Sequence, residues 1–437
     1  MKAYKEVKCC RICRNERLVP VLNLGNQVLS GIFPESSQQT IPITPLELVR
    51  CGENVGKKVC GLLQLRHSAD VEEMYGTTYG YYSSLSSSMV GHLKDTLEKL
   101  NKARNLEAGD SVLDIGCNDG TFLKLVSTEG VEKVGIDPSS KKFISKYSSD
   151  TTVICDYFSH DAIKARMGDR KFQQITAIAM FYDLDNPLQF LQDIRSILAE
   201  DGIWAIELAY LPTMLKNLVY DQICHEHVTY PALSQIEYLT ENAGLKIIDV
   251  EFNNVNGGSF LVIGSRDDSE LFSRGSKIDK ILENEKSLRQ HNHFNIFRER
   301  IEKHRTTVLE FFQEQKLNKK SVIGYGASTK GNIVLNYCGL GPEVLSAICD
   351  ANPEKLGRVT PGSNIPIISK EEMRDRDPDF LFVLIWHFHR EVLEEEREYV
   401  GRGGKIVFDL PKLHIVDSSN YEYHLKTGFQ DYQFSLT

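Results

Sequence analysis

The sequence predicts an α/β protein with two doubly wound sheets behind a small cysteine-rich domain. Apolar, strand-like segments alternate with segments of helical period from residue 71 onwards and again after residue 320, a pattern typical of parallel strands joined by helices. Five of the ten cysteines lie in the first sixty residues. We therefore expect a cysteine-rich domain over 1–70, a sheet domain over 71–265, a helical linker over 266–319 and a second sheet domain over 320–437.

The individual elements follow from the hydrophobic period. Apolar side chains recur every three to four positions over 89–104 and 277–317, as on one face of a helix. Strands are expected at 111–115, 132–136, 151–155, 174–180, 202–208 and 259–264. In the second sheet domain, a helix over 330–337 is expected among strands within 321–326, 344–350, 378–386 and 404–410.

Charge and hydropathy limit the partners of the chain. Its 437 residues carry a formal net charge of −9, whereas nucleic acids and acidic membranes usually require a basic face. No apolar run approaches the roughly 20 residues that span a bilayer, and the first ten residues, MKAYKEVKCC, lack the apolar core of a signal peptide. We expect a cytoplasmic monomer that binds neither nucleic acid nor membrane.

The N-terminal cysteines have the spacing of a structural zinc site. Cys10 and Cys13 form a C-x2-C turn, and Cys51 and Cys60 supply two more thiols. Four thiolates close the tetrahedral shell of zinc and leave no position for catalysis. Cys9 could replace Cys10, and His67 is a more distant candidate. The eight residues between Cys51 and Cys60 would have to loop out.

A glycine-bearing turn follows the predicted strand at 111–115. The string VLDIGCNDG leads into a helix-like segment, and an acid, Asp137, ends the next strand. Small residues allow close backbone approach to a ligand, and the acid can accept both ribose hydroxyls of a nucleotide. The D-I-G-x-x-x-G pattern resembles class I methyltransferases that use S-adenosylmethionine (SAM). The resemblance implies a cofactor site at Asp114, Gly116, Asn118, Gly120, Asp137, Asp156 and Tyr157.

A second polar segment, His225-Glu226-His227, follows the strand at 202–208. Open α/β sheets bind substrates at this carboxyl edge, and a histidine beside a carboxylate makes a good general base near neutral pH. The two histidines are two residues apart, unlike the four of H-E-x-x-H zinc proteases. A polar helix cap is the alternative interpretation.

Taken together, the motifs resemble the sugar C-methyltransferases that act at C-3 of nucleotide-linked 4-keto-6-deoxy sugars. The match runs from Cys60-Gly-Leu-Leu-Gln-Leu through the tyrosine-rich segment 75–84 and His225-Glu226-His227 to the strings GYGASTKGN and PGSNIPI. The resemblance implies SAM and structural zinc as cofactors and a Rossmann-like C-terminal domain. It further implies catalytic roles for His227 as base, with Glu226, His225, Tyr79 and Tyr81, and a substrate site at Tyr82, Asn256, Gly324, Gly326, Lys330 and Asn332.

Three features depart from the family pattern: the long spacing of Cys51 and Cys60, Cys224 where relatives tend to carry tyrosine, and Asn256 where histidine is common. The identity of the nucleotide, the sugar, the C-3 substituent and the stereochemistry stay open. The alternatives are an O- or N-methyltransferase on a nucleotide sugar, an NAD-dependent oxidoreductase built on Gly326 and Asp350, and a non-catalytic zinc module.

Overall fold

A computed structural model describes residues 4–53, 59–70, 74, 82–289 and 292–428. The N-terminal part forms a four-stranded antiparallel sheet in the order β11-β4-β3-β2. Its strands are β2 (Leu18–Val28), β3 (Ile43–Cys51), β4 (Leu63–Leu65) and β11 (Thr229–Tyr230). A separate pair joins β1 (Tyr4–Glu6) to β5 (His67–Ala69). Because β11 comes from the middle of the chain, the N-terminal sheet is completed by the central domain.

The central domain contains a seven-stranded sheet in the order β12-β13-β10-β9-β6-β7-β8. Five strands are parallel, and β12 and β13 form an antiparallel pair at one edge. The bounds are β6 (Ser111–Ile115), β7 (Glu132–Ile136), β8 (Thr151–Ile154), β9 (Phe172–Ile178), β10 (Leu198–Ala209), β12 (Leu245–Asn253) and β13 (Ser259–Arg266). The doubly wound sheet is as predicted, with β12 as an additional strand.

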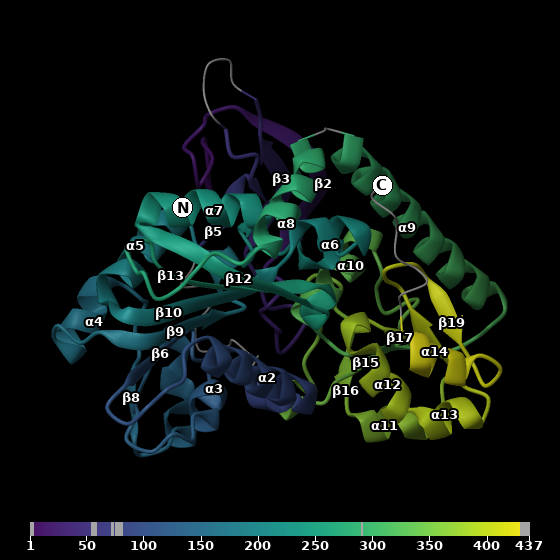
Figure 1. The fold of residues 1–437 in the computed structure, drawn as a ribbon. Helices are drawn as coiled ribbons and strands as arrows, with labels where there is room; N and C mark the ends of the chain where they lie inside the picture. The colour runs from purple at the N-terminus through teal and green to yellow at the C-terminus, as the bar shows by residue number, and fades with distance from the viewer. Residues whose placement is uncertain (1–3, 54–58, 71–73, 75–81, 290–291, 429–437) are drawn as a thin grey trace.

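Helices flank this sheet (Figure 1). They are α2 (Ser87–Ala103), α3 (Thr121–Leu125), α4 (His160–Met167), α5 (Pro187–Ile197), α6 (Leu211–Lys216) and α7 (Leu233–Ala243). Helix α2 begins where the Ser86 hydroxyl accepts the Met89 amide and buries Leu93, Leu97 and Leu100 on one face. Short 3-10 turns are η1 (Ser83–Leu85), η2 (Pro138–Lys146), η3 (Phe181–Asp183), η4 (Tyr220–Gln222) and η5 (Val255–Gly257).

The predicted helical linker is interrupted. Helix α8 (Lys277–Glu285) and turn η6 (Lys286–Arg289) precede the long α9 (Asn292–Leu317). The buried face of α9 reaches from Phe294 to Phe312 and packs on the C-terminal sheet, where Phe311 meets Phe380 edge to face. Near the other end of α9, Arg300 donates hydrogen bonds to two carbonyls of the central domain. The helix therefore connects the two sheet domains.

The C-terminal domain is a second doubly wound sheet in the order β16-β15-β14-β17-β18-β19, parallel except for β19. Its strands are β14 (Val322–Tyr325), β15 (Ile348–Cys349), β16 (Ile367–Ile368), β17 (Phe380–Val383), β18 (Lys405–Phe408) and β19 (His414–Val416). Its helices and turns are α10 (Thr329–Cys338), η7 (Pro353–Lys355), α11 (Lys370–Arg376), η8 (Trp386–Phe388), α12 (His389–Glu395), α13 (Arg397–Gly401) and α14 (Tyr421–Thr427). Within the described residues, no helix is both long and apolar enough to cross a bilayer.

Candidate active site and zinc centre

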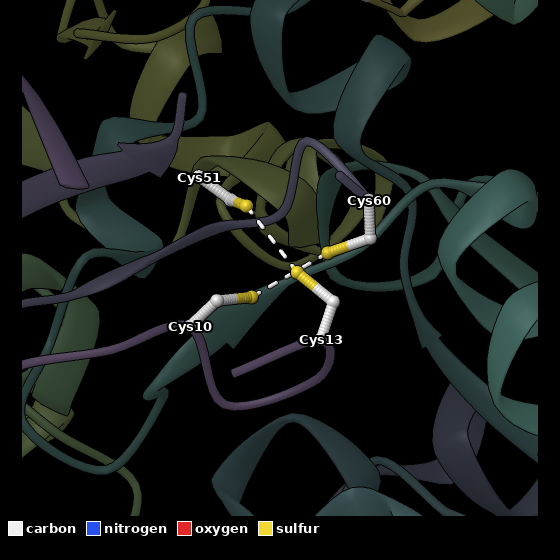
Figure 2. Close-up of side chains that lie close together, drawn as sticks. All are labelled: Cys10, Cys13, Cys51 and Cys60. Atoms are coloured by element: carbon white, nitrogen blue, oxygen red, sulfur yellow. Dashed lines mark hydrogen bonds between the residues drawn. The ribbon is translucent and has the colours of Figure 1, made fainter. Parts of the chain in front are cut away.

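Four cysteine sulfurs lie close together at the end of β3, whose last residue is Cys51 (Figure 2). Cys10 and Cys60 lie 3.4 Å apart, Cys13 and Cys51 lie 3.5 Å apart, and all four sulfurs are within 4.8 Å of one another. Zinc–sulfur bonds of about 2.3 Å place the sulfurs of a tetrahedral site about 3.8 Å apart. The arrangement therefore fits a closed four-thiolate zinc site.

The surroundings of the cluster agree with this assignment. The Asn15 side-chain amide donates a hydrogen bond to the Cys51 sulfur at 3.3 Å, the kind of contact that orients a metal ligand. Cys9 is not part of the cluster, and neither is His67, whose ring packs against Tyr4. The segment between Cys51 and Cys60 falls largely outside the described residues, which resume at residue 59.

A cavity of about 370 Å³ opens at the carboxyl ends of β6, β7, β8 and β9. It is lined by the loops that follow these strands. The loops after β6 and β9 meet at the switch point of the sheet, where the strand order reverses. Of the predicted cofactor residues, the lining contains Asp114, Gly116, Asn118, Asp137 and Tyr157. The N-terminal domain closes one side with Ser68, Ala69 and Met74.

The loop after β6 needs its first glycine. Gly116 has a φ of +74°, and a Cβ there would lie 3.0 Å from Met180 Cγ across the cavity. Gly120 also has a positive φ, but its missing side chain makes room for the Tyr147 ring. Gly120 therefore supports the loop and does not line the cavity.

Asp137 holds the same loop. One of its carboxylate oxygens accepts the Asn118 amide at 2.9 Å, and the other accepts the Ser139 amide at 2.6 Å. A carboxylate has about four acceptor positions, so two remain for the vicinal hydroxyls of a ribose. The geometry fits the predicted role of Asp137.

The other two acids of the predicted cofactor site differ from each other. Asp114 is buried and accepts the Thr176 hydroxyl at 2.7 Å; burial raises the pKa of Asp114 to about 7. Asp156 is exposed and accepts the amide of Tyr157. The cavity lining contains Tyr157 and Phe158 but not Asp156. After β8, the cavity is therefore lined by the aromatic residues Tyr157 and Phe158 and not by a carboxylate.

A smaller pocket of about 10 Å³ adjoins this cavity, and the two share the wall residue Ala179. The backbone of Ala179 has a φ of +56°, which is strained for a residue with a side chain. The pocket is lined by Ala179, Tyr182, Glu207, Leu208, Ala209, Gln222, His227, Asn256, Ser259 and Lys330. Three predicted site residues, His227, Asn256 and Lys330, therefore meet beside the cofactor cavity.

The tautomer of His227 is set by its hydrogen bond. Its Nδ1 lies 3.0 Å from the carbonyl oxygen of Gln222, which can only accept, so Nδ1 carries the hydrogen and Nε2 is the basic atom. Burial first, and then the charge of Lys330, lower the pKa of His227 to about 3. The Tyr182 ring lies 4.2 Å from the imidazole, centroid to centroid. The imidazole of His227 is thus neutral at neutral pH, with its lone pair on Nε2.

Lys330 reaches the pocket from the first turn of α10, in the C-terminal domain. Its Nζ donates to Asn256 Oδ1 at 3.0 Å. Burial lowers the pKa of Lys330, and the nearby Asp221 carboxylate opposes that shift. Asp221 itself accepts the indole N–H of Trp386 at 2.9 Å. The lysine therefore places its amino group at a junction of two domains.

His225 and Glu226 point away from this pocket. His225 Nε2 donates to the Thr44 carbonyl in β3 at 3.1 Å. The Glu226 carboxylate lies against Gly31, where a Cβ would come within 2.6 Å of it, and burial raises the pKa of Glu226. The orienting partner of His227 is the Gln222 carbonyl, not Glu226 as we expected. Both flanking residues instead fix the segment to the N-terminal domain.

The remaining predicted residues have other positions. Tyr79 and Tyr81 lie outside the described residues. Tyr82 packs on Phe143, with Lys146 Nζ 3.8 Å from its ring centroid. In the C-terminal domain, Gly324 packs against Ile348, Gly326 against Ile385, and the Asn332 amide donates to the Ser30 carbonyl. Neither pocket includes these four residues.

Sequence analysis missed three polar residues of the pocket: Glu207, Gln222 and Ser259. Glu207 is buried and bonded to His92 at 2.7 Å and to Asn253 at 3.0 Å. A signal was present, because Glu207 is an acid within the apolar run of a strand, close to its carboxyl end. Such a buried charge requires partners or a function.

Three family models match consecutive parts of the chain. "Putative zinc binding domain" matches residues 10–75, "Methyltransferase domain" matches 89–250, and "C-methyltransferase C-terminal domain" matches 254–411. The C-methyltransferase NovU of Streptomyces niveus is 27% identical over 94% of this chain and 97% of its own length. A tRNA U34 carboxymethyltransferase of Campylobacter jejuni is 23% identical over 32% of this chain and 50% of its own length.

Among solved structures, a SAM-dependent methyltransferase from Clostridium acetobutylicum is 14% identical, covers 40% of this chain and 92% of its own, and has a TM-score of 0.32. The strand order and the family models confirm the predicted fold class, an α/β class I SAM methyltransferase sheet between an N-terminal zinc-binding domain and a second Rossmann-like sheet.

Proposed function

We propose that this chain is a SAM-dependent C-methyltransferase that methylates C-3 of a nucleotide-linked 4-keto-6-deoxy sugar, with His227 as general base. Its cofactors are SAM and a structural zinc ion. One observation carries the proposal: the pocket that contains His227 and Lys330 shares the wall residue Ala179 with the cofactor cavity. A base and a cation thus lie next to the space where SAM supplies its electrophilic methyl group.

The two side chains suit the chemistry of an enolate. The hydrogen on C-3 is acidified by the neighbouring C-4 ketone, and His227 Nε2 takes this proton while the C–H electrons form the enolate. The developing negative charge on the C-4 oxygen is stabilised by the ammonium group of Lys330, as preorganised cations do in buried sites. C-3 would then attack the methyl group that bound SAM supplies; the bond between sulfur and the methyl carbon would break, and S-adenosylhomocysteine would leave. The C-4 ketone is restored, and the imidazolium of His227 returns its proton to water.

The low pKa of His227 is compatible with this step. In the substrate-free protein, burial and Lys330 oppose a positive charge on the imidazole. Proton abstraction creates the imidazolium and the enolate oxygen together, so the new negative charge offsets the nearby cations. A neutral imidazole at rest is therefore the correct starting state.

Sugar binding requires a change in the pocket. Its volume of about 10 Å³ is close to that of a single water probe. The hydrogen bond between Lys330 and Asn256 crosses from the C-terminal domain to the central domain. We therefore expect the sugar to separate these two side chains and to take over the lysine as its own partner.

The position of the new methyl group tests the proposal. The full-length protein is incubated with 13C-methyl SAM and a dTDP- or GDP-linked 4-keto-6-deoxy sugar, and the product is analysed by carbon NMR. We expect a methyl carbon bonded to C-3, formed by the wild type and by His160→Gln but not by His227→Gln. His160 is a partly exposed histidine outside both pockets. A methyl group on oxygen or nitrogen would contradict carbon methylation and support the alternative reaction class.

A further inference from the structure

Three histidines that the proposed reaction does not use meet inside the C-terminal domain. His389 begins α12, His414 begins β19 and His424 lies in α14, and Figure 1 shows these elements grouped in the last part of the fold. The side chains are 4%, 8% and 4% exposed. One nitrogen from each ring lies within 4.8 Å of the others. Elements separated by up to 35 positions thus bring three imidazoles to one point.

The hydrogen bonding of His414 and His389 is compatible with metal ligation. His414 Nδ1 lies 2.8 Å from the Lys412 carbonyl, so Nδ1 carries the hydrogen and Nε2 bears the lone pair. A carbonyl on the second nitrogen is the usual way in which a protein fixes the tautomer of a metal-bound histidine. His389 Nε2 is buried and has no hydrogen-bond partner within the described residues. A buried polar atom of this kind requires an explanation.

The chemistry of the donor set agrees. All three side chains are buried imidazoles, and a neutral imidazole nitrogen is the commonest protein ligand of transition metals. Zinc–nitrogen bonds of about 2.0–2.1 Å place the ligand atoms of a tetrahedral site about 3.4 Å apart. The three nitrogens lie within 4.8 Å of one another. Each pair would therefore have to approach by no more than about 1.4 Å to reach the spacing of a tetrahedral site.

We propose that His389, His414 and His424 bind one divalent transition-metal ion of the zinc class, as a second metal site of the protein. Three imidazoles suit zinc and its neighbours and leave one position of a tetrahedral shell for water. Neither the cofactor cavity nor the His227 pocket includes these histidines, so the ion serves structure. The ion would connect α14, the last described helix, to α12 and β19. The Phe408 ring packs beside this site, with its centroid 4.2 Å from that of the His389 ring.

The test counts metal in the full-length protein. The wild type is saturated with Zn²⁺, freed of excess by gel filtration and analysed by mass spectrometry for metal per chain. We expect two equivalents in the wild type and in His304→Gln, which removes an equally buried imidazole outside the cluster. We expect one equivalent in His414→Gln. A wild type with a single equivalent, or a His414→Gln protein with two, would overturn the proposal.

A spectroscopic measurement keeps the test valid if the variant fails to fold. Co²⁺ is added to wild-type protein whose four cysteines already hold zinc. The proposal predicts a visible d–d absorption that saturates at one equivalent, without the intense thiolate-to-cobalt charge-transfer band that a cysteine site produces. Absence of the visible band, or its appearance together with the charge-transfer band, would contradict a three-histidine site.

Discussion

Replacement of Lys330 by methionine removes the amino group from the pocket of His227 and keeps an unbranched side chain that is one heavy atom shorter. In the structure, the Lys330 ammonium group holds Asn256 at 3.0 Å, and its charge is the second largest cause of the low pKa of His227. The two groups therefore interact electrostatically in the resting protein. The substitution should change both the rate of the reaction and its dependence on pH.

The size of the effect follows from the burial of the charge. Two unit charges about 4 Å apart interact by about 4 kcal/mol at an effective dielectric constant near 20. Removal of one group that stabilises an oxyanion typically costs about 2.7–4 kcal/mol, or a factor of about 100–1,000 in kcat. We expect Lys330→Met to lower kcat by that factor and to change the KM for the sugar nucleotide less.

The pH profile gives a second readout. Because the Lys330 charge lowers the pKa of His227, its removal should raise that pKa towards the ordinary value. His227 must be neutral to accept a proton, so the acidic limb of kcat/KM should move to higher pH. Steady-state methyl transfer between pH 4 and 8 measures both effects. Lys133→Met serves as control, because Lys133 pairs with Asp150 away from both pockets. An unchanged kcat together with an unmoved acidic limb would refute the role of Lys330.

Three further substitutions test other parts of the account. Cys60→Ser should lower the zinc content by one equivalent and reduce the melting temperature, because zinc binding supplies folding energy. The control Cys9→Ser should retain the metal. Elemental analysis measures the zinc content, and thermal unfolding measures the melting temperature. Gly116→Ala should weaken SAM binding about tenfold by calorimetry, because its positive φ costs about 1–2 kcal/mol and the new Cβ enters the cavity wall. Gly339→Ala has a similar φ with open space around it and should leave SAM binding unchanged. Finally, burial lowers the pKa of His304 to about 4. Between about pH 6.5 and pH 4, His304 is protonated in the unfolded chain but not in the folded protein. Its presence should therefore lower the free energy of unfolding by about 2 kcal/mol at pH 5 relative to pH 7. Denaturant unfolding of His304→Gln at both pH values should show a correspondingly smaller loss.

Local patterns explain which parts of the fold could be predicted. The strand, glycine turn and helix around Gly116 are contiguous in sequence, and the acid at Asp137 follows at the end of the next strand. A nucleotide-binding site can therefore be predicted from these local segments without knowledge of contacts between distant parts of the chain. By contrast, β11 is only two residues long, so Thr229 and Tyr230 have no period that predicts a strand. Its pairing with β4 depends on tertiary structure alone.

The reaction pocket illustrates the same limit. Lys330 is 103 positions from His227, and only the family resemblance connects the two residues, which line one pocket in the structure. The family resemblance implies that Glu226 acts beside His227, whereas the structure places the Gln222 carbonyl on the imidazole. Neighbours in an irregular segment point in different directions, so adjacency is a poor guide to hydrogen bonding. Lys330 comes from the C-terminal domain, and only folding brings it close to His227 in the central domain.

Hydrogen exchange at C-3 of the sugar tests the central claim most directly. The wild-type protein is incubated in D2O with a nucleotide-linked 4-keto-6-deoxy sugar in the absence of SAM, and deuterium at C-3 is followed by proton NMR. The account predicts exchange catalysed by the wild type and by His160→Gln, and no catalysed exchange with His227→Gln. Exchange at the wild-type rate in His227→Gln, or methyl transfer by a wild type that catalyses no exchange at C-3, would contradict His227 as the base that forms the enolate.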